Sequence, residues 1–554
     1  MSQINFHNGE KSMTSDIQTT DPLTMRVTNF GVVNGIDYST TTGVYAWLGI
    51  PYAQPPVDSL RWMPPIDPVP WTDILATQQF GQSCAQAGRY YSPAPNNEQY
   101  GLRVRECFNK PVGNEDCLTL NIWSPSEAKG LLPVIVFIHG GSNVSGYSAD
   151  PIYDGQVLAK KANAVVVTIN YRLGILGWLD LPQLKTGDAL TDSGNFGLLD
   201  QLHALKFVKN NIAEFGGDPN NVTLIGQSAG AVNVWNLLIS PLSVGLFHKA
   251  MPLSGGLLNS SRAKAQTYSE DLLRAIVVAD GKAKDINAAK AWLNAKSSKE
   301  IAAYLRHISA DDLLNVVIDN PQLGDAPAPI EDGNVIPVDS LAALAEGRYQ
   351  KVPVIAGNTK DEGTTFSKLF GTISKTGIDG LKPNDFDRFS MEFHFDPDSP
   401  SLLTEADFIS HHYLPVSAEN SGWNALSTFV TQSMFIAAVK PPLDSLVLQQ
   451  PDKVWYYRFD WDEAPAPFDK VYGATHSLDL PFVFGNFNTN IFSFAYSKAN
   501  QAGREALSDA MIASLAAFAK TGNPNTPELG VTWENYPKKI VLDASATLLR
   551  ISNE

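Results

Sequence analysis

The sequence predicts an α/β fold in which a central, mostly parallel, twisted sheet is flanked by helices. Three runs are apolar throughout, as is typical of strands buried on both faces: residues 133–138 (PVIVFI), 164–169 (AVVVTI) and 222–225 (VTLI). Between the second and third runs, residues 197–215 carry leucine and valine at helical spacing. Strands that alternate with helices favour a parallel sheet covered on both sides.

Later segments extend the same pattern. Two further strands are expected at residues 352–356 and 454–459, where β-branched and aromatic side chains gather again. Residues 260–345 and 365–450 have mainly helical patterns. We expect these two stretches to be insertions that lie over the sheet.

The composition is that of an acidic globular protein. The 554 residues include 57 acidic and 41 basic side chains, for a formal net charge of −16. This charge repels phosphate backbones and anionic lipid, which argues against nucleic acid and membrane surfaces as partners. No stretch approaches the roughly 20 apolar residues of a membrane span. The N-terminus is polar, so we expect a cytoplasmic protein if the sequence is complete and a secreted or periplasmic one if a leader is missing.

Three cysteines fall close together in the chain, at Cys84, Cys107 and Cys117. Their spacing fits no zinc-binding pattern, and no histidine lies between them. At most one disulfide can form among three thiols. We therefore expect neither a metal nor a cofactor.

The stretch Gly226–Gly230 (GQSAG) is the strongest functional signal. It has the pattern G-x-S-x-G, and it stands between a predicted strand and a helical pattern, which is the context that makes this motif credible. A strand that turns abruptly into a helix forces the serine into strained backbone angles, so its neighbours must be small. Ser228 is the candidate nucleophile, with the helix N-terminus behind it favouring developing negative charge.

A nucleophilic serine needs a histidine as base and an acid that orients the histidine. In proteins with the G-x-S-x-G turn, the acid and then the histidine follow the serine along the chain. The candidate bases are the His411–His412 pair and His476, which follows the strand predicted at residues 454–459. Asp361 and Glu362 both come just past the strand predicted at 352–356. The residues alone do not choose between these two carboxylates.

An oxyanion hole is expected from glycine-rich backbone after an earlier strand. The sequence His139-Gly140-Gly141-Ser142 directly follows the buried run at residues 133–138. Glycine lets the backbone approach a substrate carbonyl closely and point N–H groups at it.

With these motifs in place, the chain closely resembles the type-B carboxylesterase family, which includes cholinesterases, bacterial p-nitrobenzyl esterases and fungal lipases. The resemblance runs from about residue 25 to the C-terminus. It is carried by WLGIPYAQPP (47–56), EDCLTLNIW (115–123), INYRLGILGWL (169–179), GNFGLLDQLHALKFVKNNIAEFGGDP (194–219) and the GQSAG turn. It implies an α/β-hydrolase fold with helical insertions over an active-site gorge, as a single domain at 25–554 behind a polar tail at 1–24.

The resemblance also implies roles for particular residues. It implies a serine carboxylesterase that works through an acyl-enzyme, with a Ser228, Glu362 and His476 triad in which the glutamate of D-E-G is the acid. The matching motifs place the backbone N–H groups of Gly141, Ser142 and Ala229 in the oxyanion hole. A further implication is a Cys84–Cys117 disulfide, which leaves Cys107 unpaired.

Departures from the family bear on the substrate. Gln227 stands where the family usually has glutamate, and Ser142 stands where it usually has a third glycine. The loop between Cys84 and Cys117 contains Tyr90 and Tyr91 but no tryptophan, whereas cholinesterases place a tryptophan there. A quaternary ammonium then loses its cation–π and Coulomb partners, so we expect neutral esters as substrates and no cholinesterase activity.

The same residues bear on other functions. A lipase, or an amide or carbamate hydrolase, would use the same triad. Some relatives of this family are non-enzymatic binding proteins that have lost the serine or the histidine, whereas Ser228, Glu362 and His476 are all present here. We expect a small-molecule ester as the partner and a monomeric protein.

Overall fold

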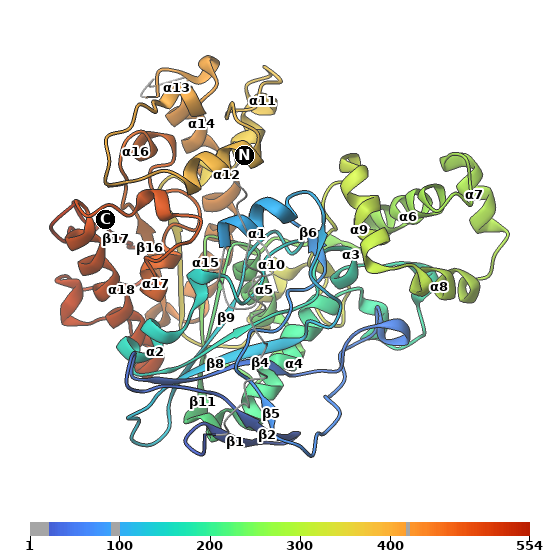
Figure 1. The fold of residues 1–554 in the computed structure, drawn as a ribbon, viewed down its shortest axis with the longest axis horizontal. Coiled ribbons are helices and arrows are strands. Elements are labelled where there is room, and N and C mark those ends of the chain that lie inside the picture. Colours follow the sequence, from blue (N-terminus) through green and yellow to red (C-terminus); the bar gives the residue numbers. More distant parts are fainter. Residues whose placement is uncertain (1–20, 90–99, 417–421) are drawn as a thin grey trace, which may run out of the picture.

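The computed structural model describes residues 21–89, 100–416 and 422–554. Within these residues, eleven strands form one large twisted sheet that runs through the molecule (Figure 1). Their order across the sheet is β18 (Ser552–Asn553), β17 (Ile540–Leu542), β16 (Val454–Phe459), β15 (Val354–Thr359), β12 (Lys249–Leu253), β11 (Gly217–Gln227), β9 (Leu132–Ile138), β10 (Val165–Ile169), β8 (Thr119–Pro125), β4 (Val44–Pro51) and β3 (Ile36–Tyr38).

The sheet is mostly parallel, as the sequence predicts. The strands from β17 across to β10 all pair in parallel. Antiparallel strands extend both edges, with β8, β4 and β3 beyond β10, and β18 beyond β17. This is the α/β-hydrolase fold, in which the carboxyl ends of the parallel strands carry the site.

Both faces of the sheet are buried, which explains the continuous apolar runs. Along β9, Val134 and Val136 belong to one apolar core, while the alternate residues Ile135 and Phe137 belong to another. The first core is closed by α4 (Phe196–Asn211) and α5 (Ala229–Ile239), and the second by α2 (Gln156–Ala162), α17 (Leu480–Phe484) and α18 (Gln501–Thr521).

The predicted strands are confirmed, and the helix expected over 197–215 is an α-helix over Phe196–Asn211 followed by a 3-10 turn over Ile212–Phe215. β9 and β10 each begin within one residue of the predicted bound, whereas two strands show larger shifts. β11 begins at Gly217 rather than at 222, because Gly217 pairs with Leu132 across a bulge in an otherwise polar stretch. β15 begins at Val354 rather than at 352. Pro353 precedes it and has no N–H to donate to the sheet, although its carbonyl accepts from Ala250 N at 3.0 Å.

The two stretches expected to be helical insertions are helical. Figure 1 shows α6 to α9 as one group at the right and α11 to α14 as another at the top. The first stretch contains α6 (Arg262–Ala279), α7 (Ile286–Asn294), α8 (Ser298–His307), α9 (Ala310–Asp319) and α10 (Ser340–Ala345). The second contains α11 (Phe370–Ile373), α12 (Asp385–Phe393), α13 (Glu405–Phe408), α14 (Gly422–Val430) and α15 (Ala437–Gln449).

The remaining strands and α-helices are short. They are β1 (Met25–Thr28), β2 (Gly31–Asn34), β5 (Leu75–Ala76), β6 (Gln86–Ala87), β7 (Pro111–Val112), β13 (Ser260–Ser261), β14 (Ile330–Glu331), α1 (Tyr100–Cys107), α3 (Gly174–Gly177) and α16 (Phe468–Val471). Among the residues that the structure describes, no helix combines the length and apolar character that crossing a membrane requires.

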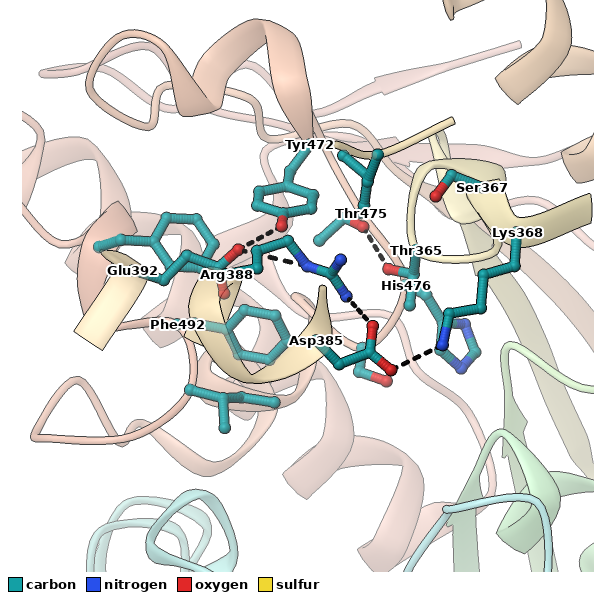
Figure 2. Close-up of a pocket in the computed structure, with 14 residues that line it drawn as sticks. Thr365, Ser367, Lys368, Asp385, Arg388, Glu392, Tyr472, Thr475, His476 and Phe492 are labelled. Carbon is teal, nitrogen blue, oxygen red and sulfur yellow. Dashed lines mark hydrogen bonds and ion pairs between the residues drawn. The ribbon is translucent and has the colours of Figure 1, made fainter. Parts of the chain in front are cut away.

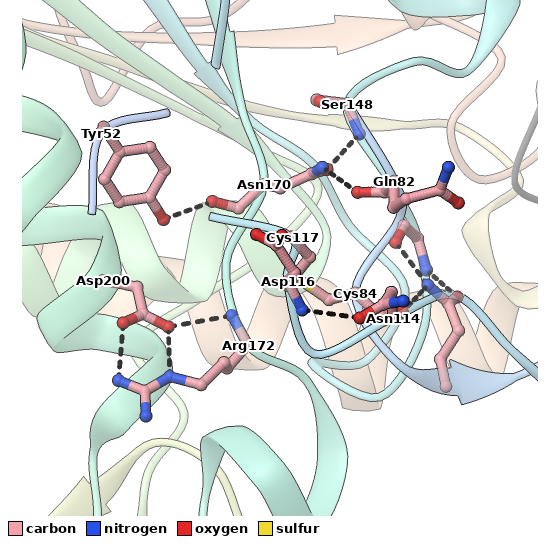
Figure 3. Close-up of a disulfide and its surroundings, with 12 residues drawn as sticks. Tyr52, Gln82, Cys84, Asn114, Asp116, Cys117, Ser148, Asn170, Arg172 and Asp200 are labelled. Atoms are coloured by element: carbon pink, nitrogen blue, oxygen red, sulfur yellow. Dashed lines mark hydrogen bonds and ion pairs between the residues drawn. A yellow bond between two sulfur atoms is a disulfide. The ribbon is translucent and has the colours of Figure 1, made fainter. Parts of the chain in front are cut away.

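The disulfide implied by the family resemblance is present between Cys84 and Cys117, with Cα atoms 4.9 Å apart (Figure 3). Cys107, at the end of α1, is half-buried and has a free thiol. Tyr90 and Tyr91, the two tyrosines of the disulfide loop, lie outside the described residues.

Candidate active site

Ser228 lies at the sharp turn between β11 and α5. Its backbone angles, φ 56° and ψ −122°, fall in the left-handed half of conformational space that side chains rarely adopt. The turn is held from both sides, since Ser228 N donates to Leu253 O at 2.9 Å and Ser228 O accepts from Val232 N at 3.0 Å. The strain predicted from GQSAG is therefore present.

The two glycines of the motif are there because the turn has no room for a Cβ atom. A Cβ on Gly226 would lie 2.3 Å from Gly230 O, and one on Gly230 would lie 2.1 Å from Ile138 O. Both distances are far shorter than a van der Waals contact. The turn therefore packs directly against the end of β9, where the glycine-rich loop begins.

The glycine-rich loop after β9 passes beside the serine. A Cβ on Gly140 would lie 3.0 Å from Ser228 Cβ, so only glycine fits at this approach. Gly141 and Ser142 adopt positive φ values of 105° and 56°, and the Ser142 side chain is exposed. Ser145 N donates to Gly141 O at 2.9 Å, which closes the loop into a tight turn.

Buried side chains fix this loop to its surroundings. Asn143 exchanges side-chain hydrogen bonds with Asn233 of α5, at 3.3 and 2.8 Å. His139 is buried and stacks on Tyr171 with ring centroids 4.5 Å apart. Burial lowers the pKa of His139 to about 4, so the ring is neutral and structural. The loop is thus held rigidly against the helix that follows Ser228.

Glu362 and His476 are joined by a hydrogen bond from His476 Nδ1 to Glu362 Oε2. Glu362 is fully buried just after β15, and its other oxygen accepts from Thr359 N at 2.9 Å. His476 is 7% exposed and contacts the rings of Phe366 and Phe435, each with centroids 5.1 Å away. The carboxylate fixes the tautomer and orientation of the imidazole, with the proton on Nδ1.

Asp361 forms hydrogen bonds with the backbone of the loop that carries His476. Its Oδ2 accepts from Ala474 N at 3.1 Å, while Asp361 N donates to Ala474 O at 3.0 Å. These bonds join the acid loop to the histidine loop two residues before His476. Burial raises the pKa of Asp361 to about 6, and neighbouring Lys360 opposes that rise. Of the two carboxylates left open by the sequence, only Glu362 contacts the imidazole.

The other imidazole nitrogen contacts Gln227, the last residue of β11. Gln227 Nε2 lies 3.2 Å from His476 Nε2 and donates to it when Nδ1 carries the ring proton. Gln227 is 2% exposed, so this contact is protected from water. The residue that departs from the family pattern therefore touches the catalytic candidate directly, a contact that the sequence alone does not reveal.

Asp479 adds a second buried carboxylate near the histidine. Tyr457 donates its hydroxyl to Asp479 Oδ2 at 2.7 Å. Burial raises the pKa of Asp479 to about 6; the Tyr457 hydrogen bond opposes the rise, and the charge of Glu362 adds to it. The side chain thus has a structural hydrogen bond to the tyrosine of β16.

The remaining histidine candidates lie elsewhere. His411 and His412 are exposed, and their rings contact each other in a tilted arrangement with centroids 4.3 Å apart. Among the described residues, no group of three or more histidine, cysteine, aspartate or glutamate side chains has a geometry that could hold a metal ion.

A cavity of about 240 Å³ borders His476 (Figure 2). Four charged side chains line it, namely Lys368, Asp385, Arg388 and Glu392, and three of them come from α12. Sequence reasoning missed this group. The available signal was the spacing of Asp385, Arg388 and Glu392, which places all three on one face of a helix.

Comparison with known proteins agrees with the fold. The model of the carboxylesterase family matches residues 22–554, and the chain belongs to that family. It is 31% identical to the para-nitrobenzyl esterase of Bacillus subtilis (strain 168) over 531 residues, which cover 94% of this chain and 95% of that protein. It is 33% identical to the fumonisin B1 esterase of Sphingopyxis macrogoltabida over 517 residues, which cover 92% and 84%.

Solved structures show the same relationship. The crystal structure of Geobacillus stearothermophilus carboxylesterase EST55 at pH 6.2 superposes with a TM-score of 0.71 at 31% identity, and the match covers 96% of this chain and 98% of that one. The chain is accordingly a carboxylic ester hydrolase of the serine type.

Proposed function

We propose that this carboxylesterase cleaves its ester with Ser228 as the nucleophile, His476 as the general base and Glu362 as the residue that orients the histidine. The observation that carries the proposal is the hydrogen bond from His476 Nδ1 to Glu362 Oε2. The other imidazole nitrogen, Nε2, contacts Gln227, the residue next to Ser228. This arrangement leaves His476 Nε2 unprotonated and directed toward the serine turn.

In the proposed reaction, His476 Nε2 takes the proton of Ser228 Oγ as the oxygen attacks the ester carbonyl. The Gln227 amide, which holds Nε2 in the free enzyme, gives way to the serine hydroxyl at this step. The imidazolium then returns the proton to the departing alkoxide, leaving an acyl group on Ser228. Water repeats the sequence, with His476 again as base, and releases the acid.

The developing oxyanion would be held by the backbone N–H groups of Gly141, Ser142 and Ala229. Gly140 lies against Ser228, and Ala229 is the first residue of α5, so its N–H is at a helix N-terminus. Each such donor is worth about 2.7–4 kcal/mol in the transition state. Because the Ser142 side chain is exposed, it stands outside the loop rather than filling it.

The assignment of the nucleophile is tested by Ser228→Ala, which should lower kcat for p-nitrophenyl butyrate by about 10³-fold or more. Ser254→Ala is the matched control. Ser254 follows the neighbouring strand β12, is buried, and has nearly the same strained φ, 54° against 56°. A Ser228→Ala enzyme that kept a tenth of wild-type turnover would exclude Ser228 from this role.

We further propose that neutral esters are preferred to choline esters of the same acid. Gln227 is neutral and buried where a carboxylate would attract a cation, and the nearby cavity presents Lys368 and Arg388. The measurement is kcat/KM for butyrylcholine against a neutral butyrate ester of matched leaving-group pKa. A faster choline ester would overturn this preference.

A further inference from the structure

The oxyanion loop, residues 139–146, closes on itself at Gly146. A Cβ atom on Gly146 would lie 2.5 Å from Gly140 O and 2.5 Å from His139 Nδ1, so the end of the loop packs directly against its beginning. Gly140 in turn lies against Ser228. A shift of Gly146 would therefore move the short stretch of backbone that carries the proposed oxyanion donors.

Gln86 binds Gly146 with both ends of its side-chain amide. Gln86 Nε2 donates to Gly146 O at 2.9 Å, and Gln86 Oε1 accepts from Gly146 N at 2.8 Å. The same Nε2 donates to Cys84 O at 2.9 Å, so both of its protons are used. Because Gln86 is 2% exposed, water does not compete for these hydrogen bonds, and their loss would leave buried backbone groups unpaired.

Gln86 itself belongs to a two-stranded ribbon that the disulfide closes. Strand β6 pairs with β7 in an antiparallel manner, with Gln86 opposite Val112. The bond between Cys84 and Cys117 joins the same two segments, two residues before Gln86. The cross-link thus fixes the backbone from which the Gln86 side chain reaches the oxyanion loop.

Apolar packing between the ribbon and the loop is incomplete. A cavity of about 40 Å³ borders Val144 of the loop and Ala87 of the ribbon. The hydrogen bonds of Gln86 therefore contribute more to the position of Gly146 than they would in a close-packed region.

A second connection holds the chain just beyond Gly146. Asn170 Nδ2 donates to Gln82 O at 2.9 Å, and Asn170 Oδ1 accepts from Ser148 N at 2.8 Å, as Figure 3 shows. This connection does not involve Gln86. We therefore expect variants of Gln86 to fold, with a loosened oxyanion loop.

We propose that Gln86 is a positioning residue of the oxyanion hole and that the Cys84–Cys117 disulfide supports catalysis through it. This proposal rests on the proposed function, since it needs the backbone N–H groups of Gly141 and Ser142 to bind the oxyanion. Preorganised donors stabilise a developing charge because they need not reorient during the reaction. A loop released from Gln86 loses this preorganisation, while the contacts of the triad stay as they are.

The first test replaces Gln86 by methionine, which has a similar length but no amide. For p-nitrophenyl butyrate, kcat should fall about tenfold to thirtyfold, which is less than the loss of about 10²–10³ expected when one oxyanion-hole donor is removed altogether. KM should stay within about twofold of the wild-type value, because the lost interaction is made mainly in the transition state.

An inhibitor that forms an oxyanion separates positioning from a general loss of structure. In the proposed site, 1,1,1-trifluorohexan-2-one adds to the enzyme when Ser228 Oγ bonds to its carbonyl carbon, the hydroxyl proton passes to His476 and the carbonyl oxygen becomes an oxyanion. Its Ki should rise in Gln86→Met by about the factor by which kcat/KM falls. A variant that merely contained more unfolded enzyme would have a lower kcat but the wild-type Ki.

Gln350→Met is the matched control. Gln350 uses its amide in the same manner, since Nε2 donates to Ser243 O at 2.8 Å and Oε1 accepts from Gly245 N at 3.3 Å. Ser243 and Gly245 follow the C-terminal end of α5, whereas Ser228 precedes its N-terminal end. Both kcat and Ki should keep their wild-type values in this variant.

A second test changes the ribbon and leaves Gln86 in place. The double variant Cys84→Ser, Cys117→Ser should raise Ki about threefold or more, because the ribbon no longer fixes the Gln86 side chain. In the Gln86→Met background the same two substitutions should change Ki by less than about twofold, since the contact through which they act is already absent. An equal rise in both backgrounds would show that the disulfide does not act through Gln86.

The two proposals can fail separately. A wild-type Ki in Gln86→Met or in the double cysteine variant would overturn the positioning role. If Ser228→Ala still bound the trifluoromethyl ketone as tightly as the wild type, the proposed nucleophile would fall instead.

Discussion

Replacing Gln227 by glutamate tests how the site is tuned. The amide nitrogen of Gln227 lies 3.2 Å from His476 Nε2, and the two side chains are 2% and 7% exposed. A carboxylate there would face the imidazolium that forms during the reaction. At an effective dielectric constant of about 20, two unit charges about 4 Å apart attract by about 4 kcal/mol.

Part of that attraction is offset, because the new carboxylate is buried and lies near the charge of Glu362. We therefore expect about 1.5–3 kcal/mol in favour of the protonated imidazole, which corresponds to one or two pH units at about 1.4 kcal/mol each. The acid limb of the pH profile of kcat/KM should move to higher pH by that amount.

The assay is kcat/KM for p-nitrophenyl butyrate between pH 5 and pH 9. Gln227→Met is the control, since it has a similar length and removes the hydrogen bond without adding a charge, and its acid limb should stay close to that of the wild type. If the limb of Gln227→Glu moved by less than half a unit, Gln227 would not stand at the imidazole in the free enzyme.

Three further perturbations follow from single contacts. Glu362→Gln should lower kcat by about 10³-fold or more and Asp361→Asn far less, and the reverse ranking in the same assay would exchange their roles. Gly230→Ala should lower the free energy of unfolding by about 1–3 kcal/mol in urea titrations, because its Cβ would lie 2.1 Å from Ile138 O, and an equally stable variant would contradict this packing. Burial raises the pKa of Asp150 from 3.8 to about 7, so the wild type loses stability as pH rises from about 4 to 7. Asp150→Asn should therefore have a higher melting temperature than the wild type at pH 8 but not at pH 4. Equal melting temperatures at pH 8 would contradict this prediction.

The central fold was predictable because its strands are buried on both faces. In β9 and β10, neighbouring apolar side chains belong to opposite cores, so nearly every position is apolar; buried Thr168 of β10 is hydrogen-bonded instead. The bounds of β11 were less predictable. Its first residues are polar and join the sheet only through the pairing of Gly217 with Leu132, which depends on the neighbouring strand.

The turn around Ser228 was predictable because local sterics dictate its composition. The turn has no room for a Cβ at position 226 or 230, so both residues must be glycine. This requirement can be recognised within five consecutive residues of the sequence. The contact of Gln227 with His476 joins residues 249 positions apart and depends on how two loops meet. No local pattern encodes such a contact.

The charged cavity was unpredictable for a related reason. Asp385, Arg388 and Glu392 lie on one helical face, which in isolation is typical of an exposed helix with its own ion pairs. Packing of α12 against α1 and residues 493–495, together with the hydrogen bond from Tyr472 to Glu392, buries Arg388 and Glu392. Burial and tertiary contacts, rather than sequence spacing, turn these charges into the lining of a cavity.

The most direct test of the central claim is to identify the residue that forms the covalent intermediate. The enzyme is treated with diethyl p-nitrophenyl phosphate, which transfers a phosphoryl group to an activated serine, and the digested peptides are mapped by mass spectrometry. We predict one equivalent of modification, located on Ser228, with labelling much slower in Glu362→Gln. Complete inactivation with the label on any other residue would contradict the account.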